Sequence, residues 1–453
     1  MTRDRLLPFA LATLVVAATP PARPVIAAPS LLADSTTVEQ WTLANGLRVT
    51  TRSIPKARDV SVTVGYRSGM DDDPANRQGL AQLMGDLGFT AMTADQPART
   101  PTDLDRDHPQ GWGYPVMRHL TLFTEVVPRD GLRKELAQCA SRMRGVRFEA
   151  ADLDLAVKRV RHELAEQYFG DRTLSLGFQV REIGLGLTDA QMLQRASGAG
   201  LAGLTPDEVK TAMGRVLVPA NAVLSLSGDL HGVDLHAEIE RLFGAIPGGT
   251  AREDAPVVAI TPGERTVRRK GEPAAVIGVI SPALSDSTHP AFYMAALLFA
   301  SVAEQSWFKP GDLHPALFQY GVFDEPELVR FYPPLKPTET DLTVADKRLA
   351  DIVDLAHGAL IGSDAYVDMR ASISWLLGGP MTAAQRSAAR SNRVVLMTLS
   401  RAQASCELRR GHAFWERYLK RLMAVRPGQP ELLVDYMINH AHQVRVMSLP
   451  SGK

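Results

Sequence analysis

Alternation of apolar and polar residues predicts a group of β-strands in the N-terminal half of the chain. In segment 59–69, DVSVTVGYRSG, the residues Val60, Val62 and Val64 recur at every second position. That spacing is typical of a strand with one buried face. The other strand candidates are segments 41–53, 119–127 and 221–230. A turn around residues 55–56 is expected to join the first two strands.

A spacing of three to four residues predicts helices between and after these strands. Segment 152–170 has a single apolar stripe, formed by Leu153, Ala156, Val157, Val160 and Leu164. Segment 131–145 is a second helix candidate. Thr205, Pro206 and Glu208 have the order of a cap, a first-turn proline and a capping-box acid, so a helix is expected to begin there.

The pattern changes near residue 247, where a stretch rich in Pro, Gly and Ala has no periodicity and is typical of a linker. Beyond it, segment 268–284 repeats the charged turn, alternating strand and small-residue exit of segment 54–70. We therefore expect an α+β protein with two related domains in tandem, each an antiparallel sheet with helices packed on one face. The predicted boundaries are 37–248 for the first domain, 249–266 for the linker and 267–450 for the second domain.

Four sets of landmarks in the first half occur in a fixed order. They are Leu43, Asn45, Gly46 and Leu47; Gly69, Asp72, Asp73 and Pro74; Gly79, Leu80 and Ala81; and Pro219, Asn221, Ala222, Gly228 and Asp229. In this order they resemble the insulinase/pitrilysin family of inverted-motif zinc peptidases, which includes the mitochondrial processing peptidase. The resemblance covers residues 37–250 well and the second half in outline.

The resemblance places the family's H-x-x-E-H motif in the helix that begins near Gly79. In active relatives the two histidines bind zinc and the glutamate acts as the base for the attacking water. This chain has Gln82, Gly85 and Asp86 at those three positions. The family's third ligand corresponds to Glu163, which could face the same cleft or lie on the shoulder of its helix. The resemblance therefore predicts no catalytic residue, no zinc and no other cofactor here, with Glu163 a possible remnant of the metal site.

Other landmarks of the family are also altered. The strand that carries Asn-Ala in relatives and touches the substrate backbone corresponds to segment 111–115, GWGYP. The Arg and Tyr that grip the peptide, seven residues apart, are not found in segment 301–323. Arg330 and Tyr332 lie nearby, but RFYPPL is more typical of an ordinary strand exit.

Two further sets of residues were weighed as metal sites. Asp103, Asp105 and Asp107 have the spacing of a calcium loop, but a histidine occupies the required glycine position and no Glu closes the loop. A solvated acidic loop is therefore expected. His440 and His442 could chelate a metal on a strand, although two histidines without further ligands are more often surface residues.

The N-terminus, the charge balance and the cysteines bear in turn on the compartment, the partners and the disulfides. Residues 1–28 have a charged start, an apolar stretch of signal-peptide length and small residues after it, so we expect export to the periplasm or the medium and no integral membrane segment after cleavage. Lys plus Arg and Asp plus Glu number 50 each, which gives no support for a nucleic-acid partner. Cys139 and Cys406 lie in different predicted domains and are expected to be separate thiols.

Three functions remain open at this stage. The first is a non-catalytic subunit that forms half of a peptide-binding chamber with an active zinc-bearing homologue, or with itself as a dimer. The second is a stand-alone exported protein that binds unstructured peptides along a sheet edge. The third is a metallohydrolase with a metal site rebuilt from Gln82, Asp86 and Glu163.

Overall fold

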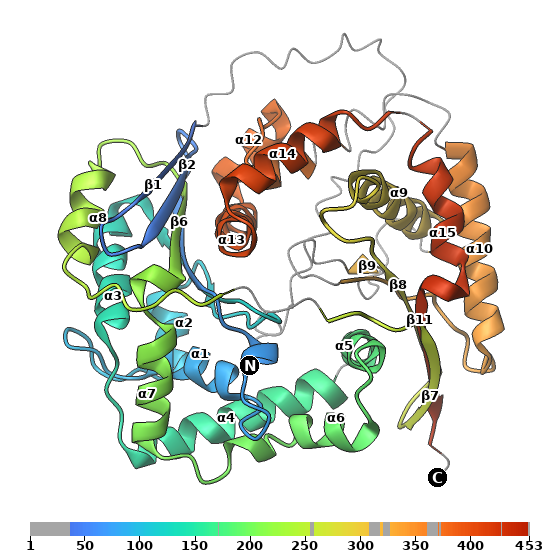
Figure 1. Cartoon of the computed structure of the whole chain (residues 1–453), viewed down its shortest axis with the longest axis horizontal. Helices are drawn as coiled ribbons and strands as arrows, with labels where there is room; N and C mark the ends of the chain where they lie inside the picture. Colours follow the sequence, from blue (N-terminus) through green and yellow to red (C-terminus); the bar gives the residue numbers. More distant parts are fainter. Residues whose placement is uncertain are drawn as a thin grey trace.

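The computed structural model describes residues 37–170, 172–253, 258–307, 318–319, 327–359, 370, 373–426 and 428–451. The expected leader, residues 1–28, lies outside this range. Two β-sheets with surrounding helices make up the described chain (Figure 1). The α+β prediction is confirmed. Among the described helices, none is long and apolar enough to cross a lipid bilayer.

The first sheet has the strand order β1-β2-β6-β3-β5-β4. Its strands are β1 (Thr37–Thr42), β2 (Arg48–Ser53), β3 (Asp59–Tyr66), β4 (Trp112–Gly113), β5 (Thr121–Pro128) and β6 (Ala222–Gly228). The β2–β6 pair is parallel and the other pairs are antiparallel. The sheet is therefore mixed, and the prediction of a purely antiparallel sheet is wrong, because β6 returns after several helices and inserts between β2 and β3.

The second sheet has the order β7-β11-β8-β10-β9. Its strands are β7 (Gly263–Arg269), β8 (Ala274–Ile280), β9 (Phe318–Gln319), β10 (Leu328–Phe331) and β11 (Gln443–Pro450). Here too one pair, β7–β11, is parallel and the others are antiparallel. The second sheet thus repeats the first without β1, so the faint sequence repeat corresponds to a real repeat of topology.

The helices lie around these two sheets. They are α1 (Leu80–Thr90), α2 (Pro101–Asp107), α3 (Leu132–Arg144), α4 (Ala150–Phe169), α5 (Arg172–Gly184), α6 (Asp189–Ala196), α7 (Pro206–Val216), α8 (Leu235–Phe243), α9 (His289–Trp307), α10 (Leu342–Ala359), α12 (Ala383–Ser391), α13 (Arg393–Arg409), α14 (His412–Met423) and α15 (Val434–Ile438). The expected start at Thr205 is observed, because Thr205 accepts a hydrogen bond from the Glu208 amide and Glu208 caps the Thr205 amide.

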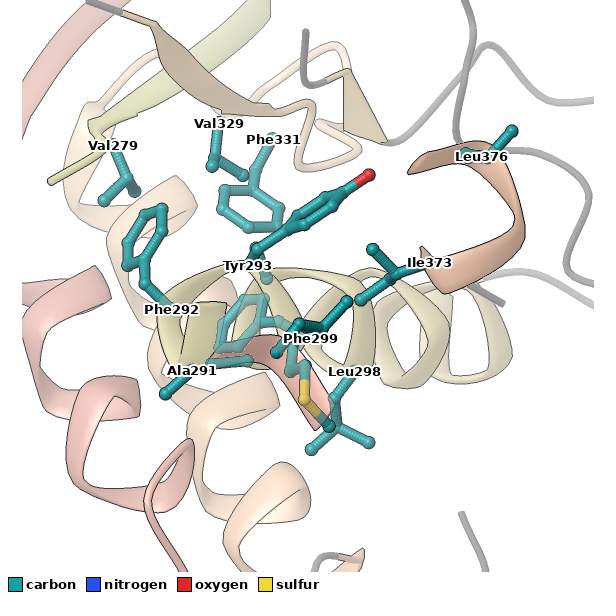
Figure 2. Packing of buried hydrophobic residues seen from close by; sticks show 14 of the residues in the cluster. Val279, Ala291, Phe292, Tyr293, Leu298, Phe299, Val329, Phe331, Ile373 and Leu376 are labelled. Carbon is teal, nitrogen blue, oxygen red and sulfur yellow. The ribbon is translucent and has the colours of Figure 1, made fainter. Parts of the chain in front are cut away.

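Each half has an apolar core between its sheet and its own helices. In the first half this core joins β3 and β6 to α1, α3 and α4. In the second half the core joins α9 to β8 and β10, and Figure 2 shows Phe292 and Phe299 of α9 together with Phe331 of β10 inside it. The Phe299 and Phe331 rings lie edge to face with centroids 5.0 Å apart.

The opposite face of each sheet is covered by a helix from the other half. Helix α13 packs across the first sheet, and α5 packs across the second (Figure 1). In the first contact Ser400 hydrogen-bonds the hydroxyls of Ser61 and Thr63 at 2.8 Å each. In the second, Leu176 and Val180 of α5 join the aliphatic residues of β8, β10 and β11. This exchange of helices locks the two halves together.

Two local predictions differ from the structure. Segment 41–53 is not one strand: β1 and β2 form a hairpin whose turn uses the positive φ of Gly46 (88°). The acidic segment that begins at residue 102 is not a loop, because Thr100 caps α2 and Asp103 completes a capping box. The prediction of two separate thiols is confirmed, since Cys139 and Cys406 are both buried and free.

Candidate functional site

The three altered motif positions lie on α1, which is buried along its whole length between the first sheet and α4. Gln82 and Asp86 are one turn apart, with 8% and 2% of their surface exposed. Glu163 comes from the neighbouring α4, as the resemblance predicts. The fold therefore still brings the positions of the family's metal site together.

An arginine from α4 places a positive charge beside Asp86 in this site. Arg159 donates to Asp86 through Nε (3.0 Å to Oδ1) and through Nη2 (2.5 Å to Oδ2), and Nη2 also donates to the Thr90 hydroxyl at 3.2 Å. Burial lowers the pKa of Arg159, but the hydrogen bond and charge of Asp86 outweigh it, so the pKa lies above its ordinary value. The contact is a bidentate ion pair, and the Asp86 carboxylate is almost fully buried.

A tyrosine from the strand exit after β4 closes the site. The Tyr114 hydroxyl lies 3.1 Å and 3.2 Å from the two oxygens of Glu163, and 3.4 Å from Asp86 Oδ1. Burial and then the charge of Glu163 raise the pKa of Tyr114 well above its ordinary value, so the phenol keeps its proton and acts as a donor. Glu163 is therefore held toward the site, and the shoulder-of-a-helix alternative is not what the structure has.

The place of the catalytic base is filled by the ring of Tyr114. A Cβ atom added at Gly85 would lie 2.5 Å from Tyr114 Cδ2, closer than two carbon atoms can approach. No side chain fits at position 85 unless the tyrosine moves. The glycine thus has a packing reason, and that packing removes the space in which a base would act.

The residues present do not fit a catalytic zinc ion. Both Asp86 oxygens are engaged by Arg159 and both Glu163 oxygens lie in hydrogen-bond range of Tyr114. Gln82 contributes a neutral amide whose buried Oε1 has no hydrogen-bond partner among the described residues. A zinc ion would have to displace the partly exposed guanidinium of Arg159, and no imidazole among the described residues joins Asp86 and Glu163 as a ligand.

The other residues weighed from the sequence are not brought together as sites. Asp105 accepts a hydrogen bond from Trp112 Nε1 at 3.0 Å, and the acidic triad lies along α2. His440 and His442 lie on a short 3₁₀ turn rather than a strand; His442 stacks on Tyr436 with ring centroids 3.7 Å apart, whereas His440 approaches Asp346.

Arg330 and Tyr332 lie at the end of β10. Arg330 is paired with Glu327. Tyr332 is 4% exposed. Its hydroxyl lies so close to Gly177 of α5 that a Cβ atom added there would be 2.0 Å from it. The interpretation of RFYPPL as an ordinary strand exit describes these positions well, with the tyrosine contributing to the contact between the halves.

Sequence reasoning missed Arg159 and Tyr114. A signal existed for the arginine, since Arg159 precedes Glu163 by one helical turn and so shares its face of α4. Tyr114 lay within the segment already identified as an altered landmark. Its contact with Gly85 depends on how β4 approaches α1, which no sequence spacing reveals.

Comparisons with known proteins concern the fold and the second part of the chain. A family model described as the peptidase M16 inactive domain matches residues 203–310. Among solved structures, a protease from Helicobacter pylori superposes with a TM-score of 0.69 at 12% identity, over 92% of this chain and 100% of that protein. No match was found among curated proteins.

Two further solved structures share the fold. The peptidase M16 inactive domain from Pseudomonas fluorescens has a TM-score of 0.64 at 14% identity, over 92% of this chain and 98% of its own. The periplasmic protease PqqL from Escherichia coli has a TM-score of 0.62 at 14% identity, and the match covers 93% of this chain but only 48% of PqqL. At these identities the structures establish a common fold.

Proposed function

We propose that this chain, a member of the M16 peptidase (insulinase) family, is a non-catalytic subunit that forms half of a peptide-binding chamber with an active zinc-bearing homologue. In this proposal the chain is exported and meets its partner in the periplasm or the medium. Its contribution is the wall of the chamber and contacts to unstructured peptide, while the partner supplies zinc and the base.

The observation that carries the proposal is the filled site on α1. Arg159 engages Asp86 where relatives have a histidine ligand, and the Tyr114 ring occupies the space of the base at Gly85. Asp86 is almost fully buried and Arg159 is partly exposed, so loss of one partner of this bidentate ion pair should cost about 1–3 kcal/mol. The site therefore favours a closed, metal-free state over the rebuilt metallohydrolase.

The comparison with PqqL is compatible with pairing. The match covers 93% of this chain and 48% of PqqL, so the matched residues correspond to about half of that protease. In the proposal a homologue with an intact motif supplies the other half of the chamber. The predicted leader, residues 1–28, supports a shared compartment.

A stand-alone peptide binder is the second candidate. Strand β1 (Thr37–Thr42) is an edge strand paired to β2, and its other edge has no strand partner in the described part of the chain. An extended peptide could add there through main-chain hydrogen bonds. This function needs no partner subunit.

Sedimentation of the mature protein purified from its native envelope separates the two. We expect a complex with a homologue that carries H-x-x-E-H, or failing that a homodimer, joined by an interface above about 1,200 Å². A stable monomer across micromolar concentrations with no co-purifying homologue would reject the paired subunit and leave the peptide binder.

A further inference from the structure

A second group of ionisable residues is buried in the first half, away from the altered motif. Glu125 lies on β5, at an alternate position with Phe123 and Val127, and its side chain pairs with Arg142 of α3. Glu135 lies on α3, and His108 ends α2. The exposed fractions of the three side chains are 5% for His108, 0% for Glu125 and 2% for Glu135. Ionisable groups this deeply buried require compensation.

The three side chains converge on one point. Each offers one ligand atom, and these atoms all lie within 4.8 Å of one another. A tetrahedral ion bound about 2.1 Å from each donor would hold the donors roughly 3.4 Å apart. The donor atoms would therefore have to approach one another by at most about 1.4 Å to close around an ion.

His108 is the member that the protein itself leaves unsatisfied. Neither ring nitrogen has a hydrogen-bond partner among the described residues. The closest charged atom, Glu135 Oε2, lies 3.8 Å from Nδ1, beyond hydrogen-bond range. Burial lowers the pKa of His108, which keeps the imidazole neutral, the form that binds metals.

Arg142 compensates the carboxylates only in part. Its Nη1 lies against Glu125 Oε1, and its Nη2 is 3.5 Å from Glu135 Oε1. Even so, neither Glu125 oxygen has a hydrogen bond of acceptable geometry within the described chain. The guanidinium also lies 4.8 Å from the centre of the Phe89 ring, and its charge disfavours protonation of His108 without giving the imidazole a hydrogen bond.

A bound cation would take the place of a proton in this cluster. The charges that act on it are Glu125, Glu135 and Asp107 on the negative side and Arg99 and Arg142 on the positive side. Burial, and then the charge of Glu125, raises the pKa of Glu135 to about 8, so the protonated cluster has no excess of charge. A cation placed between the carboxylates and the imidazole would displace this proton and give the His108 ring a partner.

We propose that His108, Glu125 and Glu135 bind one divalent transition-metal ion in the core of the first half. One imidazole nitrogen with two carboxylates suits zinc and its neighbours, whereas calcium and magnesium prefer oxygen ligands alone. All three ligands are buried, so the ion has a structural role and fastens α2, β5 and α3 together. The site is distinct from the family's motif on α1.

Zinc binding to the whole mature chain tests this directly. After chelator treatment and dialysis, Zn²⁺ alone is titrated by calorimetry while bound zinc is measured by elemental analysis. We expect one zinc per chain and a thermal midpoint that rises with zinc concentration. His108→Gln and Glu135→Gln should each weaken binding by at least about 100-fold and abolish the thermal shift.

A matched control is His119→Gln. His119 is equally buried, at 5% exposed, but its Nδ1 already lies 3.1 Å from Asp72 Oδ1, so its replacement should leave zinc affinity unchanged. If His108→Gln does not fold, Glu135→Gln and the zinc-dependent midpoint of the unmodified chain decide the question.

The possible outcomes also separate this site from the proposed function. Absence of zinc binding, or one zinc retained by both His108→Gln and Glu135→Gln, would overturn the proposal. Zinc that is lost on Glu163→Ala but kept in His108→Gln would overturn it too, and would count against the non-catalytic subunit. Zinc lost in His108→Gln and kept in Glu163→Ala supports this site and leaves the proposed function intact.

Discussion

The two halves of the molecule share one strand order but differ in what they bury. On the second sheet, β10 places Val329 and Phe331 in a core of aliphatic and aromatic side chains (Figure 2). On the first sheet, the corresponding strand β5 places Glu125 between Phe123 and Val127. The same topology therefore supports an apolar interior in one half and a partly ionisable interior in the other.

The sheet faces that contact the other half differ in the same sense. Helix α13 contacts the first sheet partly through hydroxyls, including Ser400 with Ser61 and Thr63. Helix α5 contacts the second sheet through aliphatic side chains. The comparison teaches that the repeat conserves strand order and helix exchange, while the chemistry of each buried face is set separately.

The largest effect is expected in the apolar half. Phe331→Ala removes a fully buried ring from the second core and should lower the free energy of unfolding by about 3–5 kcal/mol. Leu355→Ala, at a side chain that is 52% exposed, should change it by less than about 0.5 kcal/mol. Urea denaturation measures both, and a small loss for Phe331→Ala would show that this core is not packed as described.

Restoring the zinc motif should fail unless the residues that fill the site are also removed. Gln82→His, Gly85→Glu and Asp86→His together place a glutamate against the Tyr114 ring and leave Arg159 in the pocket. Adding Tyr114→Ala and Arg159→Ala should tighten zinc binding by roughly 100-fold over the triple variant, about 2.7 kcal/mol. Calorimetry in a His108→Gln background isolates this site, and equal affinities would contradict the role given to Arg159 and Tyr114. Little turnover is expected even with zinc bound, because the substrate-gripping positions are altered as well.

The ion pair on α1 should contribute measurable stability. Arg159→Met leaves the buried Asp86 carboxylate without its partner, and the free energy of unfolding should fall by about 1–3 kcal/mol, since Arg159 itself is partly exposed. Lys158→Met on the exposed face of the same helix is the control and should have little effect. A double-mutant cycle with Asp86→Asn should give a coupling energy of about 1 kcal/mol or more, and additivity would contradict the pair.

A buried histidine in the second half should make stability fall in acid. His289 is 1% exposed, hydrogen-bonded to the Tyr418 hydroxyl at 2.7 Å, and burial with the nearby charge of Arg421 lowers its pKa to about 3, while Asp286 opposes this. Between pH 6.5 and pH 3 the histidine is therefore protonated in the unfolded chain and neutral in the folded chain. The contribution of His289 to the free energy of unfolding is constant above pH 6.5, and it falls by about 1.4 kcal/mol per pH unit between pH 6.5 and pH 3.

His289→Asn keeps a hydrogen-bonding group near Nδ1 and removes the titration. Its unfolding free energy should lose this contribution to the slope between pH 6.5 and 4, as measured by urea denaturation at several pH values. An unchanged slope would assign the acid sensitivity to other groups.

Much of the fold follows from local patterns in the sequence. The alternation in 59–69, the apolar stripe of 152–170 and the capping box at Thr205 all predicted elements that the structure has. The hairpin inside 41–53 was missed because its turn at Gly46 was included in a single predicted strand. The acidic segment was mistaken for a loop because its carboxylates suggested a cation, whereas Asp103 caps a helix.

The candidate site was less accessible from sequence. The losses at positions 82, 85 and 86 are visible in the chain, but their replacement by Arg159 and Tyr114 is a tertiary contact. Likewise, His108, Glu125 and Glu135 meet only because α2, β5 and α3 pack together. A glutamate at an alternate position with Phe123 and Val127 in the predicted strand 119–127 was the one local sign of that cluster.

The central claim is that the first half of this chain cannot act as a zinc peptidase, and a cleavage assay tests it most directly. The purified mature chain is incubated with an unstructured peptide, with added Zn²⁺ and separately with chelator. The account predicts no cleavage above buffer in either condition. Chelator-sensitive cleavage that disappears in Asp86→Ala or Glu163→Ala, and persists in His108→Gln, would contradict it and establish a rebuilt catalytic site on α1.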